Sequence, residues 1–243
     1  MKFKNQEIFN GKKVLLTGGT GHLGRVVAKA FLESGASVAS SYLRSAGTSG
    51  ISRDLMGSML LVRSDVTSED QVVALFAAVK KKFGTLDILI NLVGGYLPTR
   101  KLVDLETKNW DAMLAINLRS MFLCSREFLK SLPNYRYGRI ISMSAIPAIT
   151  PSAGRGSYAV SKSGVSVLTK VLGEELKGTG VTSNAIAPSI IRTQPNMEAM
   201  PTADFDSWVS PEDIASTMIY LCTNEAGAIN GLTIPMVGGV TIE

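Results

Sequence analysis

The sequence contains one histidine, His22, and two cysteines among its 243 residues. A Ser-His-Asp triad would have to take its histidine from the glycine-rich turn around His22, and a centre of several histidines cannot form. We therefore expect no metal site, and any acid–base chemistry must come from tyrosine, lysine or carboxylate side chains. Cys124 and Cys222 lie in apolar helical patterns, which predicts reduced core residues and suits a cytoplasmic protein.

Long apolar runs are also missing. No run reaches the ~18 residues of a membrane-spanning helix, and Met1 to Glu7 lack the apolar stretch and cleavage site of a signal peptide. The net charge of +5 invites a nucleic-acid hypothesis. However, the one dense basic run, Lys80 to Lys82, closes a predicted helix, where cations complement the dipole, and no recognition motif accompanies it. We expect neither a membrane span nor specific nucleic-acid binding.

The sequence does contain an alternation of short apolar runs with longer amphipathic stretches, which is typical of βαβ units. About seven strands are predicted, at 13–17, 37–43, 59–62, 86–91, 139–144, 181–187 and 232–237. Helices are predicted at 21–34, 67–83, 107–132, 157–177 and from Pro211 onward. No repeat or domain-sized linker interrupts the pattern. The pattern therefore predicts that residues 1–243 form one doubly wound, Rossmann-like α/β domain, with a parallel sheet and helices on both faces.

Two segments break this pattern. Residues 43–58 are rich in serine and glycine where a second crossover helix would be expected, which predicts a short or irregular helix. Residues 194–210 contain two prolines and predict a loop with one helical turn.

Gly18, Gly21 and Gly24 separate the first predicted strand from the first predicted helix. Glycines there allow a tight turn, close approach of the backbone to a pyrophosphate and close helix–strand contact, while the helix N-terminus faces the anion. The flanking strand and helix favour a dinucleotide site over a purely structural turn. At the end of the second strand, 40–44 offers no acid and one arginine, Arg44, which favours NADP over NAD unless Arg44 is only a solvated loop residue.

Tyr158 and Lys162 are four residues apart in a predicted helix, so they share one face. A tyrosine phenol, with an ordinary pKa of ~10, is a poor base at neutral pH, and an adjacent ammonium stabilises its phenolate. Such a pair is common on ordinary helices, so it indicates catalysis only together with other motifs.

Six motifs occur in the order of the short-chain dehydrogenase/reductase family: Thr17 to Gly24, Asp65-Val66, Asn91 to Gly94, Asn117, Tyr158 to Lys162, and Pro188 to Thr193. The chain resembles the compact single-domain branch of this family, and above all its 3-oxoacyl-carrier-protein reductase-like members. The resemblance covers essentially the whole chain. It implies an NAD(P)-dependent oxidoreductase that moves a hydride between nicotinamide and a carbonyl or alcohol substrate.

The resemblance also implies a role for each cofactor-binding residue. Asp65 would accept a hydrogen bond from the adenine amino group, with Val66 beside the ring. Asn91 would tie central strands together, and Gly94 would make room for the nicotinamide ribose. The remaining cofactor contacts would come from Thr17, Gly18, Thr20, His22, Leu23, Gly24, Arg44, Tyr158, Lys162, Pro188 and, at the nicotinamide carboxamide, Thr193.

In catalysis, the resemblance makes Tyr158 the group that exchanges a proton with the substrate oxygen. Lys162 would hold the nicotinamide ribose, and Asn117 would order water behind Lys162.

The chain departs from its relatives at three positions. The middle glycine of the loop stands at 21 rather than 22, and we expect His22 to pack over the turn, with contact to the pyrophosphate as the alternative. Ser189 replaces the glycine usual after Pro188. Ala145 stands thirteen residues before Tyr158, where the family has a serine that donates to the reacting oxygen.

Removing one such donor costs roughly 10²–10³ in rate, so three hypotheses follow. The first is a working reductase with a substitute donor: Ser144, if a bulge re-aims it from the other face of the strand, or Ser152, or a group on the substrate. Ser142, on the same face as Ser144, is a weaker candidate. The second is a slow or specialised reductase, and the third is an inactive dinucleotide-binding protein that acts as a sensor or assembly partner.

Ligands of such sheets bind at the carboxyl ends of the strands, so the substrate opening should lie between residues after Gly94, 146–156 and 194–208. The last segment is short for a lid, which predicts an open site for a small or protruding carbonyl substrate. We expect no cluster of cationic residues there to mark a particular anion. By resemblance, the chain forms a homo-oligomer, a tetramer or dimer, through the helices around Asn117 and Tyr158 and through the last strand.

Overall fold

In the computed structural model, which describes residues 7–44 and 52–240, the strands form one parallel sheet in the order β3-β2-β1-β4-β5-β6-β7. The strands are β1 (Lys13–Thr17), β2 (Ser37–Tyr42), β3 (Met59–Arg63), β4 (Ile88–Asn91), β5 (Gly138–Met143), β6 (Val181–Pro188) and β7 (Thr233–Met236). The chain crosses from β3 over β2 and β1 to β4, so the order reverses at the β1–β4 pair. The doubly wound, seven-stranded Rossmann-like sheet is thereby confirmed.

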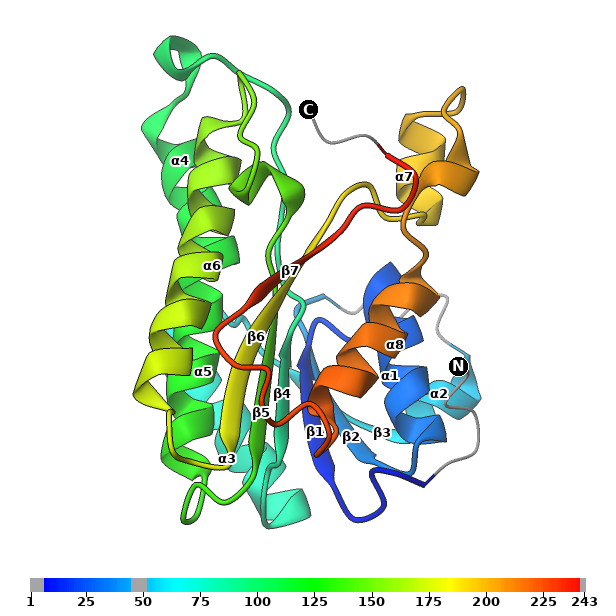
Figure 1. Cartoon of the computed structure of the whole chain (residues 1–243), viewed down its shortest axis with the longest axis vertical. Helices are drawn as coiled ribbons and strands as arrows, with labels where there is room; N and C mark the ends of the chain where they lie inside the picture. Colours follow the sequence, from blue (N-terminus) through cyan, green and yellow to red (C-terminus); the bar gives the residue numbers. More distant parts are fainter. Residues whose placement is uncertain (1–6, 45–51, 241–243) are drawn as a thin grey trace.

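Helices cover both faces of the sheet (Figure 1). The helices are α1 (His22–Glu33), α2 (Arg53–Gly57), α3 (Glu69–Phe83), α4 (Thr107–Leu114), α5 (Ser120–Ser131), α6 (Gly156–Glu175), α7 (Gln194–Ala199) and α8 (Pro211–Cys222). One face carries α3 to α6, and the other carries α1, α2 and α8. None of the described helices is long and apolar enough to span a membrane.

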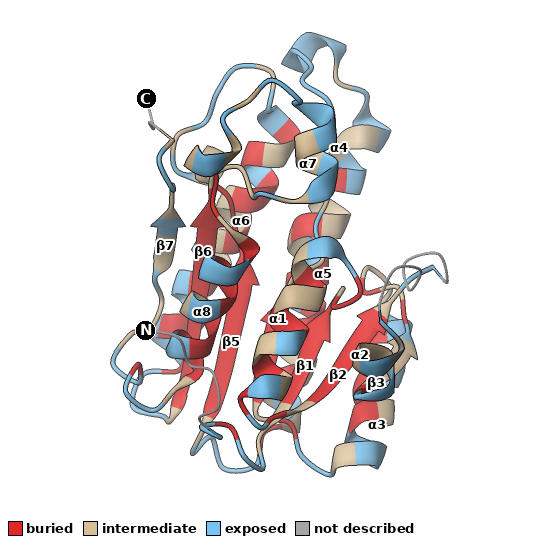
Figure 2. Cartoon of the chain, turned by 90° about the vertical axis from the view of Figure 1, so that its right-hand side faces the viewer, coloured by how far each residue is buried: buried red, intermediate tan, exposed pale blue. Residues whose placement is uncertain are grey.

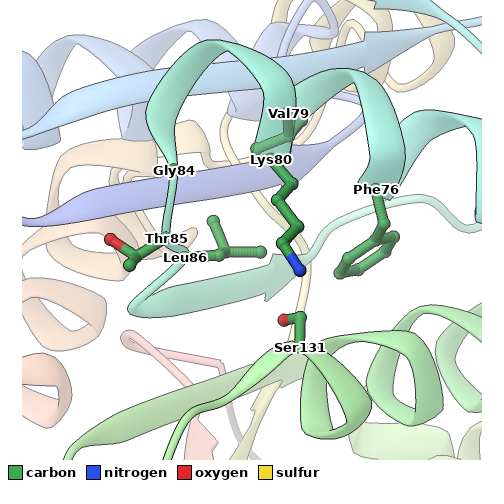
Figure 3. Close-up of a pocket in the computed structure, with 7 residues that line it drawn as sticks. All are labelled: Phe76, Val79, Lys80, Gly84, Thr85, Leu86 and Ser131. Atoms are coloured by element: carbon green, nitrogen blue, oxygen red, sulfur yellow. The ribbon is translucent and has the colours of Figure 1, made fainter.

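The five inner strands are buried, the edge strands β3 and β7 are partly exposed, and the segments beyond the carboxyl ends of the strands are largely exposed (Figure 2). Helix α7 and the start of α4 lie at this end of the sheet. At the opposite end, α3, the segment between α3 and β4, and the end of α5 leave a pocket of about 10 Å³ (Figure 3). That volume is about the minimum for one water molecule, so the pocket is too small for a dinucleotide.

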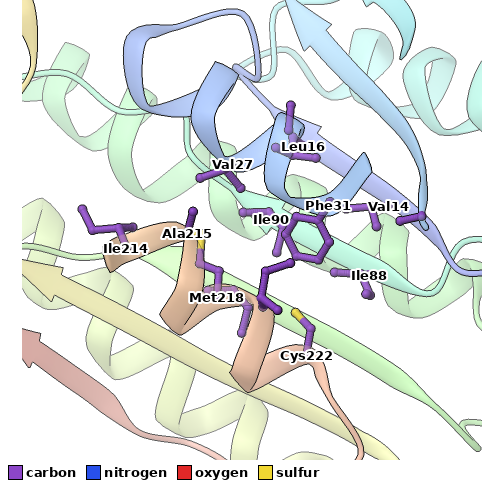
Figure 4. Packing of buried hydrophobic residues seen from close by; sticks show 14 of the residues in the cluster. Val14, Leu16, Val27, Phe31, Ile88, Ile90, Ile214, Ala215, Met218 and Cys222 are labelled. Atoms are coloured by element: carbon purple, nitrogen blue, oxygen red, sulfur yellow. The ribbon is translucent and has the colours of Figure 1, made fainter. Parts of the chain in front are cut away.

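The core has two layers because side chains alternate between the faces of each strand. Val14 and Leu16 of β1 pack with Phe31 of α1 and Met218 of α8 (Figure 4). Leu15, between them, faces the α3 and α5 side instead. Cys124 and Cys222 are buried free thiols, as predicted. One lies in each layer of the core. Burial raises the pKa of both thiols and keeps them protonated.

Two predicted elements differ from the structure, and a third agrees with it. The helix predicted at 107–132 is α4 and α5 joined by a π-helical turn, Ala115–Arg119. The segment 194–210 holds α7 and a 3₁₀ turn, Phe205–Ser207, and so contains more helix than predicted. The second crossover helix is the five-residue α2, which confirms a short helix, although residues 45–51 of that segment lie outside the described residues.

Candidate active site

The glycine loop between β1 and α1 is packed so tightly that side chains are excluded. A Cβ on Gly24 would stand 2.3 Å from the Gly18 carbonyl oxygen and 2.6 Å from the Gly19 Cα. Gly18 itself has φ +70°, a conformation that favours glycine. Helix α1 therefore begins directly against the loop, at the position where a Rossmann fold holds a pyrophosphate.

The first turn of α1 leaves its backbone N–H groups to a ligand or solvent. Its N-cap is Gly21, which makes no side-chain cap, and the first turn carries no acid. A pyrophosphate fits this position because it accepts such N–H groups and is attracted by the helix dipole. His22 is exposed, with Nδ1 3.2 Å from the Arg25 guanidinium. Leu23 packs against the core, and Thr20 is buried in the loop.

Hydrogen bonds bring the carboxyl ends of β1, β2 and β4 together. The Thr17 hydroxyl accepts from the backbone N–H groups of Leu92 at 3.0 Å and Val93 at 3.2 Å. The Gly18 N–H donates to the Ser41 hydroxyl at 3.2 Å. Arg44 is exposed just beyond the end of β2. The loop predicted to bind phosphate and the residue predicted to select NADP thus lie at the same end of the sheet.

Asp65, Val66 and Asn91 also have structural roles. The Asp65 carboxylate accepts from the backbone and hydroxyl of Thr67, at 2.9 and 2.7 Å, before α3. Val66 is buried in the core layer beneath α3. Asn91 Nδ2 donates to Ser142 of β5 and Ser125 of α5, so it does tie central elements together. The predicted contacts of Asp65 and Val66 with adenine stay predictions.

Gly94 brings the backbone after β4 against the predicted catalytic residues. A Cβ there would lie 2.8 Å from Asn117 Oδ1 and 3.1 Å from Lys162 Nζ. Lys162 is buried on α6, and its ammonium donates to the Met143 carbonyl at 2.7 Å. Burial lowers the pKa of Lys162 to about 8, because an ammonium is poorly solvated there. The sequence motifs after β4, in the π-helical turn and on α6 therefore meet at one place.

Asn117 stands inside the π-helical turn and is almost fully buried. Its Oδ1 accepts from Gly95 N–H at 2.9 Å, and its Nδ2 donates to the Gly95 carbonyl at 3.1 Å and to Ser161 at 3.0 Å. These bonds join the long helical segment to the strand end and to α6. Wide turns of this kind are frequent at functional sites.

Tyr158 is half-buried near the N-terminus of α6, with its ring edge-to-face against Tyr96 at a centroid distance of 5.2 Å. Burial raises the pKa of Tyr158 to about 12, a shift that Arg155 opposes and Tyr96 reinforces. The charge of Arg155 thus favours the phenolate, while the Lys162 ammonium donates to the Met143 carbonyl. The phenol keeps its proton at neutral pH, which is the form that a general acid requires.

Ala145 is buried just after β5, in extended conformation. The β5–β6 pairing runs without a bulge to Met143, and the Ser144 N–H continues it to Ile186. The Ser144 hydroxyl bonds the Lys162 carbonyl and Ser166, on the α6 side of the strand. This placement disfavours Ser144 as the missing donor.

The two other serines suggested as donors differ in exposure. The Ser142 hydroxyl accepts from Asn91 and is buried. Ser152 is exposed, in the loop that leads to α6. Ser152 and a group on the substrate therefore remain the candidates compatible with the structure.

Beyond β6, the chain turns toward α7. Pro188 is the buried last residue of β6, and Thr193 is the N-cap of α7. Ser189, in place of the usual glycine, donates its N–H to the Met236 carbonyl of β7 at 2.8 Å and its hydroxyl to the carbonyl of the next residue, Val237, at 2.9 Å. The predicted contact between Thr193 and nicotinamide stays a prediction.

The sequence led us to expect no cluster of cationic residues that marks a particular anion at the substrate opening, and the structure brings two arginines together there. Arg100 and Arg155 line one cavity beside Tyr158. Their sequence positions, 55 residues apart, carry no periodicity or spacing that could have predicted this approach.

A doubly wound parallel sheet with a glycine turn between β1 and α1 defines a class, the dinucleotide-binding α/β proteins. The sequence profile described as "Enoyl-(Acyl carrier protein) reductase" matches residues 20–241. The chain belongs to this family, within the short-chain dehydrogenases/reductases, and is an oxidoreductase.

Relatives of known name agree with this assignment. A 3-oxoacyl-[acyl-carrier-protein] reductase of Synechocystis is 30% identical over 238 residues, which cover 94% of this chain and 96% of the relative. D-threitol dehydrogenase of Mycolicibacterium smegmatis is 31% identical, covering 96% and 94%. A short-chain dehydrogenase/reductase mutant of Serratia marcescens superposes with a TM-score of 0.85 at 26% identity, covering 95% and 98%. These likenesses extend along essentially the whole chain, but the two enzymes whose names state a substrate differ in it.

Proposed function

We propose that the chain reduces carbonyl compounds with NADPH. The observation that carries this proposal is the meeting of Lys162, Asn117 and Gly94 at the strand ends that also hold the glycine loop, with Tyr158 one turn before Lys162 on α6. When bound, a reduced nicotinamide supplies the hydride. The loop and the first turn of α1 would hold the pyrophosphate, and Gly94 would leave room beside Lys162 for the nicotinamide ribose.

Tyr158 is the general acid in this proposal. Its hydroxyl donates a proton to the carbonyl oxygen as the carbon is reduced, and its high pKa keeps that proton available at neutral pH. Lys162, with a pKa near 8, carries a positive charge in most molecules at pH 7 and orients the ribose. Asn117 positions the Gly95 backbone and α6 around this pair.

The test is NADPH oxidation followed by absorbance with a panel of aldehydes and ketones, together with calorimetric titration of NADPH and NADH. Turnover that depends on Tyr158 supports the proposal. Tight cofactor binding without turnover of any carbonyl would instead support the alternative, a sensor or assembly partner. Failure to bind either dinucleotide would overturn both functions.

NADP specificity in this proposal rests on Arg44. Its guanidinium, exposed beyond β2, can pair with a 2′-phosphate, which NAD lacks. Replacing Arg44 with alanine is expected to weaken NADPH binding about tenfold, the effect of losing one charge-assisted hydrogen bond, and to leave NADH binding unchanged. Calorimetry measures both dissociation constants. Arg136→Ala, an exposed arginine before β5, is the control. Equal losses for NADPH and NADH would show that Arg44 does not select the cofactor.

We further propose that α5 and α6 form an interface between copies of the chain. Val160, Val167 and Val171 lie on one outer face of α6 and are 47%, 63% and 43% exposed, and Phe122 of α5 is 43% exposed. Exposed apolar side chains that gather in this way mark interaction surfaces. Val167→Glu is expected to lower the mass measured by light scattering to that of a smaller species. Val73→Glu, which places the same charge on exposed α3, should not. A wild-type monomer would contradict the proposal.

A further inference from the structure

A cavity of about 190 Å³ opens beside Tyr158, between the segment after β4 and the loop that leads into α6. Its walls combine apolar side chains of the first segment with two arginines, Arg100 and Arg155, and with the phenol. An apolar cavity of roughly 150 Å³ is known to hold benzene. This cavity can therefore accept a small molecule, or one end of a larger one, in contact with the proposed general acid.

The two arginines are brought together by a contact between backbones. The Arg100 N–H donates to the Gly154 carbonyl at 2.8 Å. Gly154 has φ +79°, and a Cβ on it would stand 2.2 Å from the Thr99 methyl carbon. Glycine at 154 thus permits both the backbone conformation and the close approach of the two segments. The juxtaposition of Arg100 and Arg155 is therefore built into the backbone of the fold.

Ring contacts connect Arg155 with the phenol. Its guanidinium carbon lies 5.8 Å from the centroid of the Tyr96 ring, within the range of a cation–π contact. The Tyr96 ring in turn packs edge-to-face on Tyr158. The effect of Arg155 on the pKa of Tyr158 agrees with this proximity.

No acid among the described residues neutralises the positive charge at the cavity. No carboxylate lines the cavity, and within 7–44 and 52–240 neither Arg100 nor Arg155 forms an ion pair with an acid. Glu106, which is near Arg100 in sequence, pairs with Lys108 at 2.7 Å. Two guanidinium groups without acidic partners, next to a reacting centre, provide a fork geometry that matches a carboxylate.

We propose that the substrate is an oxo acid, whose carboxylate binds between Arg100 and Arg155 while Tyr158 protonates its carbonyl oxygen. This inference rests on the proposed function and names its substrate class. The size of the cavity suits an oxo acid with few carbon atoms. The two positively charged arginines favour the carboxylate of such an acid over a neutral ketone of the same shape.

The test compares each of 2-, 3- and 4-oxopentanoate with its own methyl ester, which keeps the carbonyl and removes the charge. Calorimetry is run on the protein saturated with NADP⁺, because oxidised cofactor and a ketone cannot react. The tightest acid is expected to bind at least about tenfold better than its ester, the magnitude of one charge-assisted hydrogen bond or more. Arg155→Gln and Arg100→Gln should each reduce this preference to within about threefold, as expected for loss of such a bond.

Matched variants separate charge from general damage. Arg155→Lys keeps the charge and should retain part of the preference, and Arg136→Gln, before β5, should retain all of it. Equal binding of every acid and its ester by the wild-type protein would overturn the inference. Turnover of the esters with NADPH is measured separately, so the proposed function can stand when the inference fails. If NADP⁺ does not bind, the same titrations on the protein alone still compare acid with ester.

Discussion

Tyr158→Phe is expected to lower kcat/KM for carbonyl reduction by about 10³-fold, since general acid catalysis contributes roughly 10²–10⁴. The substitution removes only the hydroxyl and keeps the ring that packs against Tyr96. NADPH affinity should therefore change less than about twofold, because the ring contact is retained. The comparison uses initial rates of NADPH oxidation with the best substrate of the panel and calorimetry for the cofactor.

Tyr220→Phe provides the matched control, because it removes the same group from an exposed tyrosine on α8. Its rate should equal that of the wild type. If Tyr158→Phe keeps the wild-type rate while its melting temperature is unchanged, Tyr158 is not the proton donor. An equal loss of rate and of NADPH affinity would place Tyr158 in cofactor binding rather than in proton transfer.

Ala145→Ser is expected to raise kcat about 10²-fold, because one preorganised donor to a developing oxyanion is worth roughly 10²–10³. The backbone at Ala145 is extended, with φ −162° and ψ 159°, which serine adopts without strain. The hydroxyls of Ser142 and Ser144 are already engaged with Asn91 and with α6. The new hydroxyl would therefore add a donor at the position where the family has one.

Ala148→Ser, three residues further along, controls for the addition of a hydroxyl to this loop. It should leave kcat unchanged. An unchanged rate in Ala145→Ser would mean that Ser152 or a group on the substrate already serves as donor. Turnover that appears only in Ala145→Ser would show that the wild-type chain belongs to the slow or non-catalytic class. Without substrate, the new hydroxyl of Ala145→Ser would be buried and unpaired, which costs about 1–3 kcal/mol of folding stability. Melting temperatures of the variant and the wild type measure this loss.

Local patterns predicted the elements whose formation depends on nearby residues. Gly84, with φ +78°, ends α3 as expected, and Pro211 opens α8 at its favoured position. The π-helical turn was not predicted, because it depends on the bonds from Asn117 to Gly95 and Ser161. Helix α7 was predicted only as one helical turn within a loop. It is short, and Asn196 Nδ2 donates to the Ile191 carbonyl beside it, a contact that helical periodicity does not report.

The sequence alone determined the alternation of strands and helices, the glycine turn after β1, and the four-residue spacing of Tyr158 and Lys162. These features follow from backbone conformation and from the periods of strand and helix, which are properties of neighbouring residues. Tertiary structure decided which way Ser144 points, that Arg155 lies over the Tyr96 ring beside Tyr158, and that Arg100 and Arg155 line one cavity. Each of these depends on contacts between segments far apart in the chain, and such contacts are set by packing and backbone hydrogen bonds rather than by local sequence.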